Sequence, residues 1–520
     1  MLSTPAGDLS PGALAELVPG PVARPALRRD HVLWAMLGAS LLLKLALAIL
    51  VDGHQPVLDE VAYLGLARTL AGEGRFTGTF RPPLYPAFMA LFLVTGLGTL
   101  GVRVAQALVS TVSAALVYRI AGRLFDRRTA RIGAALFAFN PVLIAFSHRL
   151  WSETLFILLL LVALDLLVTA ARSRGRLPWL VAGATLGLAG LARPLILTFV
   201  PLLLPWAVLQ LVRWRRVAGA PPLARPWLEA TLRFALLAAA AGAVVLPWTV
   251  RNYVTTGGVI LVDANGPFNF LVGTQPEAAF VDKDDMWSER FARVDGRRYE
   301  DYVLVNPLHA QELALATAKR NIREHPGLYL RKSLWEAGHL WTVDSFLLRH
   351  VRNGWYGSLV PAWSVPFITI GAAGFVALLV LFGLGGLLAM PTSPFRGLAL
   401  LLLAHSTLLF GLTYSLSRYA LPLHAVLTFG AAMVLASPHA AARGLRRSPG
   451  GAARALTLAA ALLFVGVAWT RDLPLLHDMI ATGGSNHHFR MERIEPRAGG
   501  PRDQAAASPQ SSLPPGIRGD

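Results

Sequence analysis

The chain has 520 residues, of which 54% are hydrophobic and 15% charged, and its mean hydropathy is +0.51. This composition excludes a soluble multidomain protein and indicates a polytopic membrane protein. The absence of cysteine excludes disulfides and thiolate-bound metals, and the net charge of +18 falls largely in short loops between apolar runs, so no nucleic-acid partner is expected.

Eleven apolar runs are candidates to cross a bilayer, since a transmembrane helix needs about 20 such residues. About thirty polar residues precede the first run, so residues 1–31 are expected to form a cytoplasmic tail rather than a signal peptide. The region 178–212 is interrupted by Arg193-Pro194, which would break a continuous helix. The candidate spans are 32–51, 100–121, 130–147, 153–171, 178–192, 194–212, 230–247, 363–389, 397–415, 420–436 and 455–470.

Arginine clusters in the loops indicate the orientation. With eleven spans they all fall on one side of the membrane, which the positive-inside rule makes cytoplasmic. This agreement requires the short apolar run 83–97 to lie at the interface rather than to cross. We therefore predict a multi-pass protein of the plasma (inner) membrane with its N-terminus in the cytoplasm and its C-terminus outside. The clusters are Arg24/Arg28/Arg29, Arg123/Arg127/Arg128/Arg131, Arg172/Arg174/Arg176, Arg213/Arg215/Arg216/Arg225 and Arg443/Arg446/Arg447.

The predicted fold class is an all-α polytopic membrane protein with about eleven transmembrane helices. Interfacial helices are expected in the first outer loop, where 59–71 has near-helical apolar spacing, and a small outer lobe is expected later in the chain. The predicted divisions are a tail 1–31, a catalytic transmembrane module 32–247 with its first outer loop 52–99, an outer segment 248–361, C-terminal transmembrane helices 362–470, and a mostly disordered tail 471–520.

Asp59 and Glu60 are two adjacent carboxylates just beyond the first span. Ions at that level lose hydration unless they are paired or metal-bound, which makes the pair a candidate site. Adjacent helical residues point about 100° apart, so one can face a cavity while the other caps the helix. Helix capping is the commoner use of such acids, and the membrane-proximal position favours chemistry for one of them.

The second candidate is the turn Arg81-Pro82-Pro83-Leu84-Tyr85-Pro86. The two prolines fix the backbone and could hold Arg81 rigidly for an anion such as a phosphate. The alternative is an interfacial arginine that contacts lipid headgroups, with Tyr85 in the aromatic belt. The sequence leaves these two interpretations equal.

Further charged residues occur at the outer ends of spans. Glu153 begins an apolar helix, where it could act only as a cap, or could join Asp59 as base and cation ligand in one cavity. Basic residues on the outer side go against the charge bias, and a shared anionic ligand would explain them, although headgroup binding would explain any single one. These positions are Arg193-Pro194, Arg251-Asn252-Tyr253 and Arg418-Tyr419.

The ordered set of motifs resembles the C-type polytopic glycosyltransferase superfamily, and within it the polyprenyl-phosphate-sugar-dependent enzymes related to protein mannosyltransferases and aminoarabinose transferases. The resemblance runs from about residue 32 to about residue 436. It rests on the acidic pair, on RPPLYPAFMALF, on the stretch from RVAQALVSTVSAAL to SHRLWSETLFILLLL, on LPWTVRNYVTTGGVILVDANGPFNFLVGTQP and on SRYALPLH.

The resemblance implies that a sugar is transferred from a polyprenyl-phosphate donor to a lipid, glycan or protein acceptor at the outer face of the membrane. It implies Asp59 as catalytic base, Glu153 as a second acid, and Arg81, Arg251 and Arg418 as residues near the donor phosphate. The predicted site has Asp59, Glu60 and Glu153 as catalytic residues. The predicted substrate-binding residues are Tyr63, Arg81, Tyr85, Arg193, Arg251, Asn252, Arg418 and Tyr419.

Two departures from the aminoarabinose pattern leave the sugar and the metal open. Those enzymes read Asp-Glu-x-Arg-Tyr, whereas this chain has Ala62 in place of the arginine, and Phe80 stands where they place a glutamate. Whether a divalent cation takes part is therefore undecided.

The rival functions are a flippase or transporter of lipid-linked saccharides, and an O-antigen ligase or polymerase. A transporter would favour ionisable residues near the bilayer midplane, whereas these acids cluster at the outer mouth.

Overall fold

The structure is a computed structural model that describes residues 30–173, 175–217, 225–276, 293–294, 297–446 and 450–483. These residues are mainly helical and include one short antiparallel ladder, β1 (Arg293–Val294) with β2 (Arg297–Arg298). The helices of the N-terminal half are α2 (His31–Val51), α3 (Asp59–Glu73), α4 (Leu84–Val94), α5 (Gly98–Leu124), α6 (Arg127–Ala138), α7 (Pro141–His148), α8 (Glu153–Arg172), α9 (Leu177–Ala192), η2 (Pro194–Leu202), α10 (Leu203–Val217) and α11 (Pro226–Thr256).

The second half begins with short helices and ends with long ones. The short helices are α12 (Asn265–Thr274), α13 (Tyr299–Val305), α14 (Pro307–Glu324), α15 (Pro326–His339), α16 (Phe346–Arg352), η5 (Gly357–Leu359) and η6 (Ala362–Ser364). They are followed by α17 (Val365–Ala389), α18 (Pro394–Leu412), η7 (Ser417–Ala420), α19 (Leu421–Ala436), α20 (Pro438–Arg446), α21 (Gly451–Trp469) and α22 (Leu473–Thr482). The all-α polytopic fold is therefore confirmed.

Nine helical segments in the described part of the chain are long and apolar enough to span a membrane, against eleven predicted spans. A tenth predicted span, 130–147, is the pair α6 and α7, which is bent by 51°. The remaining one, 178–192, is α9, which has only 16 residues and is shorter than a full span. The protein is therefore an integral membrane protein, and its described residues hold nine long apolar helices, or ten candidate spans if the bent pair counts as one.

Both irregular spans have a local cause. The side chain of Asn140 accepts hydrogen bonds from the backbone N–H groups of Val142 and Leu143, and Pro141 follows it, so a new helix starts there. Pro194 likewise cannot donate to the carbonyl four residues earlier, and the chain continues after Arg193 as the tighter η2. The predicted interruption at Arg193-Pro194 is present.

Glycines allow the closest helix contacts. A Cβ atom on Gly183 or Gly187 of α9 would lie 2.1 or 2.7 Å from a carbonyl oxygen of α11, and one on Gly386 of α17 would lie 2.0 Å from the carbonyl oxygen of Gly430 of α19. Two bare helix faces can pack this closely without a side chain between them, as is common inside membranes. These contacts fix α9 on α11 and α17 on α19, and so fix the helix ends that carry the site.

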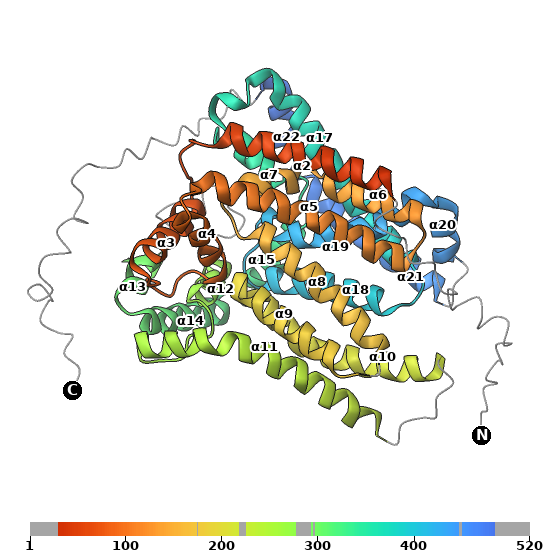
Figure 1. The fold of residues 1–520 in the computed structure, drawn as a ribbon, viewed down its shortest axis with the longest axis horizontal. Coiled ribbons are helices and arrows are strands. Elements are labelled where there is room, and N and C mark those ends of the chain that lie inside the picture. The colour runs from red at the N-terminus through yellow and green to blue at the C-terminus, as the bar shows by residue number, and fades with distance from the viewer. Residues whose placement is uncertain are drawn as a thin grey trace, which may run out of the picture.

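The two ends of the bundle are built from different elements. At one end, carboxylates are held by arginines: Asp30 accepts hydrogen bonds from Arg127 and Arg131, and Asp165 pairs with two arginines of α5 at 2.6 Å each. At the other end, α3 and α4 of the segment 52–99 lie together with α12, α13 and α14 (Figure 1). The predicted interfacial helices 59–71 and 83–97 correspond to α3 and α4.

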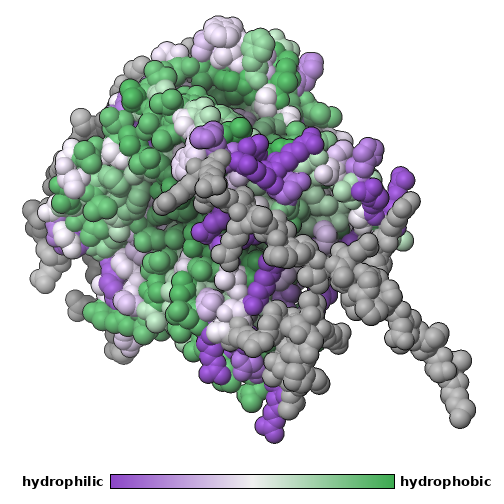
Figure 2. Space-filling model, turned by 45° about the vertical axis from the view of Figure 1, so that its right-hand side comes forward, coloured by the Kyte–Doolittle hydropathy of each residue, from purple (hydrophilic) through white to green (hydrophobic). Residues whose placement is uncertain are grey.

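Large apolar side chains remain exposed along the sides of the bundle. Examples are Leu42 on α2, Val254 on α11, Phe367 on α17 and Leu463 on α21, each at least 70% exposed. Figure 2 shows one face, on which apolar residues form a wide surface and hydrophilic residues gather in separate patches. Such a surface is suited to lipid rather than to water.

The predicted tails are only partly described. Residues 1–29 and 484–520 lie outside the described residues, as does much of 277–296 within the outer segment. Residues 473–482, which the sequence assigned to a mostly disordered tail, form α22. This helix packs against α17, and Asp472 at its start accepts hydrogen bonds from Thr342 and Val343 of the outer segment.

Candidate active site

Asp59 opens helix α3 directly after a strained residue. Leu58 has a φ of 52°, a left-handed conformation that costs a leucine about 1–3 kcal/mol. The carboxylate of Glu60 accepts hydrogen bonds from the backbone N–H groups of Val57 at 3.0 Å and Leu150 at 2.8 Å. Glu60 thereby ties this turn to the segment before α8 and fixes the direction in which the Asp59 side chain leaves the helix.

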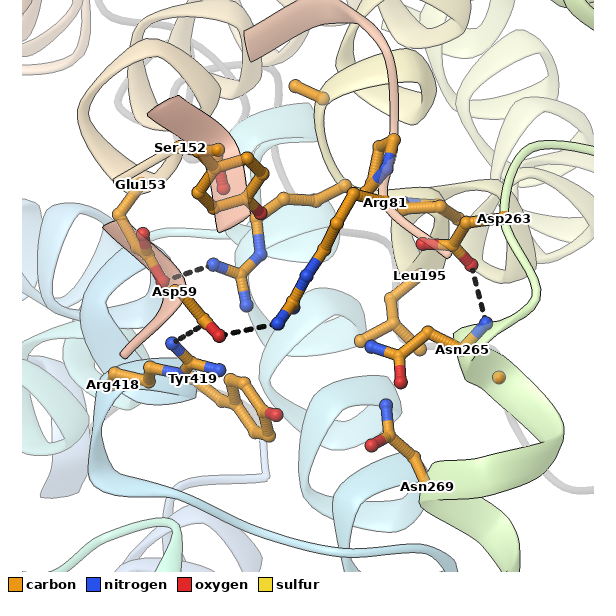
Figure 3. Close-up of a pocket in the computed structure, with 16 residues that line it drawn as sticks. Asp59, Arg81, Ser152, Glu153, Leu195, Asp263, Asn265, Asn269, Arg418 and Tyr419 are labelled. Carbon is orange, nitrogen blue, oxygen red and sulfur yellow. Dashed lines mark hydrogen bonds and ion pairs between the residues drawn. The ribbon is translucent and has the colours of Figure 1, made fainter. Parts of the chain in front are cut away.

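Asp59 bridges two arginines from distant parts of the chain. One carboxylate oxygen accepts a hydrogen bond from Arg81 and the other accepts one from Arg418, each at 2.6 Å (Figure 3). Burial alone would raise the pKa of the Asp59 carboxyl. The charges and hydrogen bonds of the two guanidinium groups outweigh burial and hold this pKa well below its usual value. Asp59 is therefore ionised at neutral pH.

A second ion pair lies beside the first. Glu153, the first residue of α8 and only 2% exposed, accepts a hydrogen bond from Arg193 at the end of α9. The guanidinium of Arg193 also lies 5.4 Å from the ring centre of Tyr419, and this ring stacks on Phe410 at 4.7 Å. The break at Pro194 is what turns Arg193 away from the α9 axis, because α9 ends at Ala192.

The ion pairs of Asp59 and Glu153 line one cavity of about 100 Å³ at the end of the bundle, here named the charged pocket. Side chains from α3, the turn before α4, α8, the end of α9, the start of α12 and η7 converge on it (Figure 3). Its polar and aromatic lining is Asp59, Tyr63, Arg81, Ser152, Glu153, Arg193, Asp263, Asn265, Asn269, Arg418 and Tyr419. Three fixed cations beside carboxylates form a site suited to exchange one anion for another.

A second cavity, here named the apolar pocket, adjoins the charged pocket. The two share Arg193, Leu195 and Tyr419 in their linings. The apolar pocket lies among α8, η2, α18 and α19, all parts of candidate spans, and its further lining is Phe156, Leu160, Ile196, Leu402, His405, Ser406, Leu409, Phe410, Pro422 and Leu423. An amphiphilic ligand could therefore place a charged head in one cavity and an apolar chain in the other.

Seven of the eleven predicted site residues meet in the charged pocket, and four do not. Those that meet are Asp59, Tyr63, Arg81, Glu153, Arg193, Arg418 and Tyr419. Glu60 faces Val57 and Leu150 and lies 3.3 Å from Arg149, in a shell behind the pocket. Tyr85 is fully buried and donates its hydroxyl proton to Gln106.

Arg251 and Asn252 support the site from outside. Arg251 donates to the backbone carbonyls of Phe76 and Gly78 in the first outer loop, and its guanidinium lies over the ring of Trp248. Asn252 is fully buried and donates to the carbonyls of Ile260 at 3.0 Å and Val262 at 3.1 Å. These two residues hold the segments that present Arg81 and Asp263, and neither lines the charged pocket.

Sequence reasoning missed Asp263, Asn265 and Asn269. They belong to the segment LVDANGPFNF, which contributed to the family resemblance as a motif, without any of its residues being singled out. Asn265 and Asn269 are four residues apart at the start of α12 and so share one helix face, a spacing that could have drawn attention to them. Asp263 precedes this helix and offered no comparable local signal.

The described residues contain no group of three or more His, Asp or Glu side chains arranged to hold a metal ion. Within the charged pocket, the carboxylates of Asp59 and Glu153 are each paired with arginine. The divalent cation left open by the sequence stays an open expectation.

Residues 80–248 match the family model of the dolichyl-phosphate-mannose-protein mannosyltransferases. The match confirms the predicted resemblance to C-type membrane glycosyltransferases. The matched stretch contains Arg81, Glu153 and Arg193, and it lies between Asp59 on one side and the Arg251–Asp263 segment on the other. No curated protein matches the chain.

Solved structures with a similar arrangement of helices are distant. The oligosaccharyltransferase AglB of Archaeoglobus fulgidus, in complex with an inhibitory peptide and a dolichol-phosphate, is 17% identical with a TM-score of 0.47, over 88% of this chain and 57% of its own. ArnT of Cupriavidus metallidurans, bound to undecaprenyl phosphate, is 17% identical with a TM-score of 0.38, over 78% and 79%. The chain spans little more than half the length of the archaeal enzyme. Both scores lie below 0.5, which is too low to transfer a function.

Proposed function

We propose that this protein transfers a sugar from a polyprenyl-phosphate-linked donor to an acceptor hydroxyl at the outer face of the plasma (inner) membrane. The observation that carries this proposal is the junction of the two cavities. A pocket with three arginines shares Arg193, Leu195 and Tyr419 with an apolar pocket among spanning helices. A lipid phosphate has this same division into an anionic head and an apolar chain. The family match over residues 80–248 supports the same donor class.

The arginines supply positive charge where the leaving phosphate gains negative charge. Arg81, Arg193 and Arg418 come from three different elements; Arg81 and Arg418 share the carboxylate of Asp59, and Arg193 pairs with Glu153. A phosphate oxygen can take the place of a carboxylate oxygen on a guanidinium group at little cost, because both accept the same forked hydrogen bonds. Cations already held in place stabilise the transition state without reorganisation.

Asp59 is the proposed general base. While it is paired with Arg81 and Arg418 it is a weak base, because these two arginines hold its pKa well below the usual value. A donor phosphate that binds these two arginines would withdraw part of their charge from Asp59. The pKa of Asp59 would then rise and the carboxylate could accept the acceptor's hydroxyl proton. Donor binding would thus activate the base, and the free enzyme would not deprotonate bystander hydroxyls.

The reaction follows from this arrangement as a single displacement. The acceptor oxygen forms a bond to the anomeric carbon while its proton passes to Asp59, and the bond from that carbon to the phosphate oxygen breaks. The polyprenyl phosphate leaves against the arginines. The acceptor of the sugar would be a lipid, a glycan or a protein.

The outer-face location rests on charge. Asp30 and Asp165 pair with arginines of α5 and α6, and the junction of these two helices lies at the opposite end of the bundle from α3 and α4 (Figure 1). Positive loops remain in the cytoplasm, so the charged pocket would face outward.

A panel of polyprenyl-phosphate sugars, offered to purified protein in detergent or nanodiscs with lipid and glycan acceptors, tests the proposal. We expect release of free polyprenyl phosphate with one donor and an inverted anomeric configuration in the product. Protein that moves the intact donor between leaflets of a vesicle, and releases no polyprenyl phosphate, would instead be a transporter.

A further inference from the structure

Asp263 is the one carboxylate in the lining of the charged pocket for which the described residues give no cation partner. Asp59 and Glu153 are paired with arginine, whereas the hydrogen bond that Asp263 accepts comes from the backbone N–H of Asn265 at 3.3 Å. In Figure 3, Asp263 and Asp59 lie on opposite sides of the Arg81 side chain, and Asp263 lies just before the start of α12. It is held there by Asn252, which binds the carbonyls of Ile260 and Val262 just before it.

The two carboxylates that flank Arg81 have opposite electrostatic environments. Burial raises the pKa of Asp263 to about 7. The hydrogen bond from Asn265 and the charges of Arg81 and Arg193 lower this pKa, but they do not outweigh burial. The pKa of Asp59 is displaced in the other direction by its direct arginine contacts. Carboxyl groups with pKa values pushed apart within one site take different roles.

An anion in the pocket would increase this difference. It would neutralise Arg81 and Arg193, the two cations that favour ionised Asp263, and would add its own negative charge. An ionised Asp263 would repel a phosphate, whereas a protonated one can donate a hydrogen bond to it. The charged and titratable groups that face Asp263 are Arg81 from the turn before α4, Arg193 from the end of α9 and Tyr299 of α13, with Asp59, Glu153 and Arg418 across the cavity.

We propose that Asp263 recognises the donor in its protonated form, as a hydrogen-bond donor to the phosphodiester, and that binding of the donor takes up one proton. This inference rests on the proposed function, because it takes the lipid phosphodiester as the ligand of the charged pocket. It assigns the pocket two unlike carboxyl groups: Asp59 for the acceptor's proton and Asp263 for the donor's phosphate.

The test is the pH dependence of binding of a polyprenyl methyl phosphodiester to the full-length protein. This probe keeps a single negative charge from pH 5 to 9, so it does not titrate itself. We expect the dissociation constant of the wild-type protein to rise about tenfold between pH 6 and pH 8, as linkage to one group of pKa about 7 requires. Calorimetry in buffers of different ionisation enthalpy should detect about one proton taken up near pH 8.

Two variants of Asp263 test whether its proton causes the pH dependence of phosphodiester binding. Asp263→Asn is neutral and keeps an N–H donor, so its affinity should vary less than about twofold over the same pH range. Asp263→Ala lacks the donor and should bind about tenfold more weakly than wild type at pH 6. Glu312→Gln, an exposed carboxylate on α14, should keep the wild-type pH dependence.

The outcomes distinguish this inference from the proposed function. Wild-type binding that does not change with pH, or an Asp263→Asn variant with the wild-type pH dependence, would overturn the role of Asp263 and leave the glycosyltransferase proposal intact. Absence of phosphodiester binding at every pH would overturn both. An Asp263→Asn variant that binds as wild type at all pH values but transfers no sugar would make Asp263 a base and overturn its role as donor.

Discussion

Asp59 and Arg418 are separated by 359 positions in the sequence and form a 2.6 Å hydrogen-bonded ion pair. The guanidinium of Arg418 is held on its other side by the ring of Trp151, whose centre lies 4.6 Å away. This contact joins the start of α3 to η7, between α18 and α19. It is the pairing on which the charged pocket depends.

Replacement of Asp59 by Asn should abolish sugar transfer and also destabilise the protein. Removal of one partner of a buried ion pair leaves the others uncompensated, at a cost of about 3 kcal/mol. Because the pKa of Asp59 is lowered from 3.8, its stabilisation is fully present above about pH 4 and is lost only as the pH falls further. The difference in stability between wild type and variant should therefore be constant from pH 5 to 8, as measured by thermal unfolding in detergent.

The matched control is Glu73→Gln on the same helix. Glu73 pairs with Arg75, but the two side chains are 50% and 72% exposed, so the loss should stay below about 1 kcal/mol with transfer unchanged. Full transfer activity in Asp59→Asn would remove Asp59 as the base.

Replacement of Glu60 by Gln should act on the fold rather than on the chemistry. Val57 and Leu150 donate to different oxygens of the Glu60 carboxylate, so a glutamine can keep only one of these two hydrogen bonds. The variant also leaves Arg149 without a counter-charge among buried groups, so a lowered unfolding temperature is expected. Below that temperature, the Michaelis constant for the donor and the pH profile of transfer should match wild type. Loss of transfer at wild-type stability would instead place Glu60 among the catalytic groups.

Arg251→Ala should affect loop stability and turnover, whereas Arg81→Ala should affect binding of the phosphodiester. Arg251 binds the carbonyls of Phe76 and Gly78, so its loss should speed hydrogen exchange in residues 74–83 and reduce the turnover number, with phosphodiester affinity changed less than about threefold. Arg81 lines the pocket, and its loss should weaken binding by at least about tenfold. A large loss of affinity in Arg251→Ala with unchanged exchange would mean that Arg251 contacts the phosphate directly.

Ser406→Trp should separate the lipid chain from the phosphate head. Ser406 lines the apolar pocket and is 8% exposed, so an indole there would fill the cavity. We expect affinity for a long-chain polyprenyl phosphodiester to fall at least about tenfold, because its buried methylene groups contribute about 0.8 kcal/mol each. Affinity for a phosphodiester with a single isoprene unit should not change, and Ser406→Ala serves as the small control. Equal losses for both ligands would place the lipid chain elsewhere.

Much of this architecture is encoded locally. The apolar runs, the break at Arg193-Pro194 and the short helices α3 and α4 follow from hydrophobicity, proline chemistry and helical spacing, each of which acts over a few residues. The same reasoning marked Asp59, Arg81 and Glu153 as charges that needed partners at an apolar boundary. The two spans that differ from expectation, 130–147 and 178–192, depend on a cap at Asn140 and on a helix too short to cross alone.

The pairings were decided by the tertiary structure. Nothing local distinguishes Arg251, which binds loop carbonyls, from Arg418, which binds Asp59, because both are outer arginines followed by polar or aromatic residues. Nor does the sequence separate Asp59, held ionised by two guanidinium groups, from Asp263, which is partly buried without one. The sequence alone determined a polytopic membrane protein with charges near the ends of its apolar helices, and left their partners unassigned. Helix packing decided which charges meet, because the partner and the dielectric around each ionisable group come from elements that are remote in the chain.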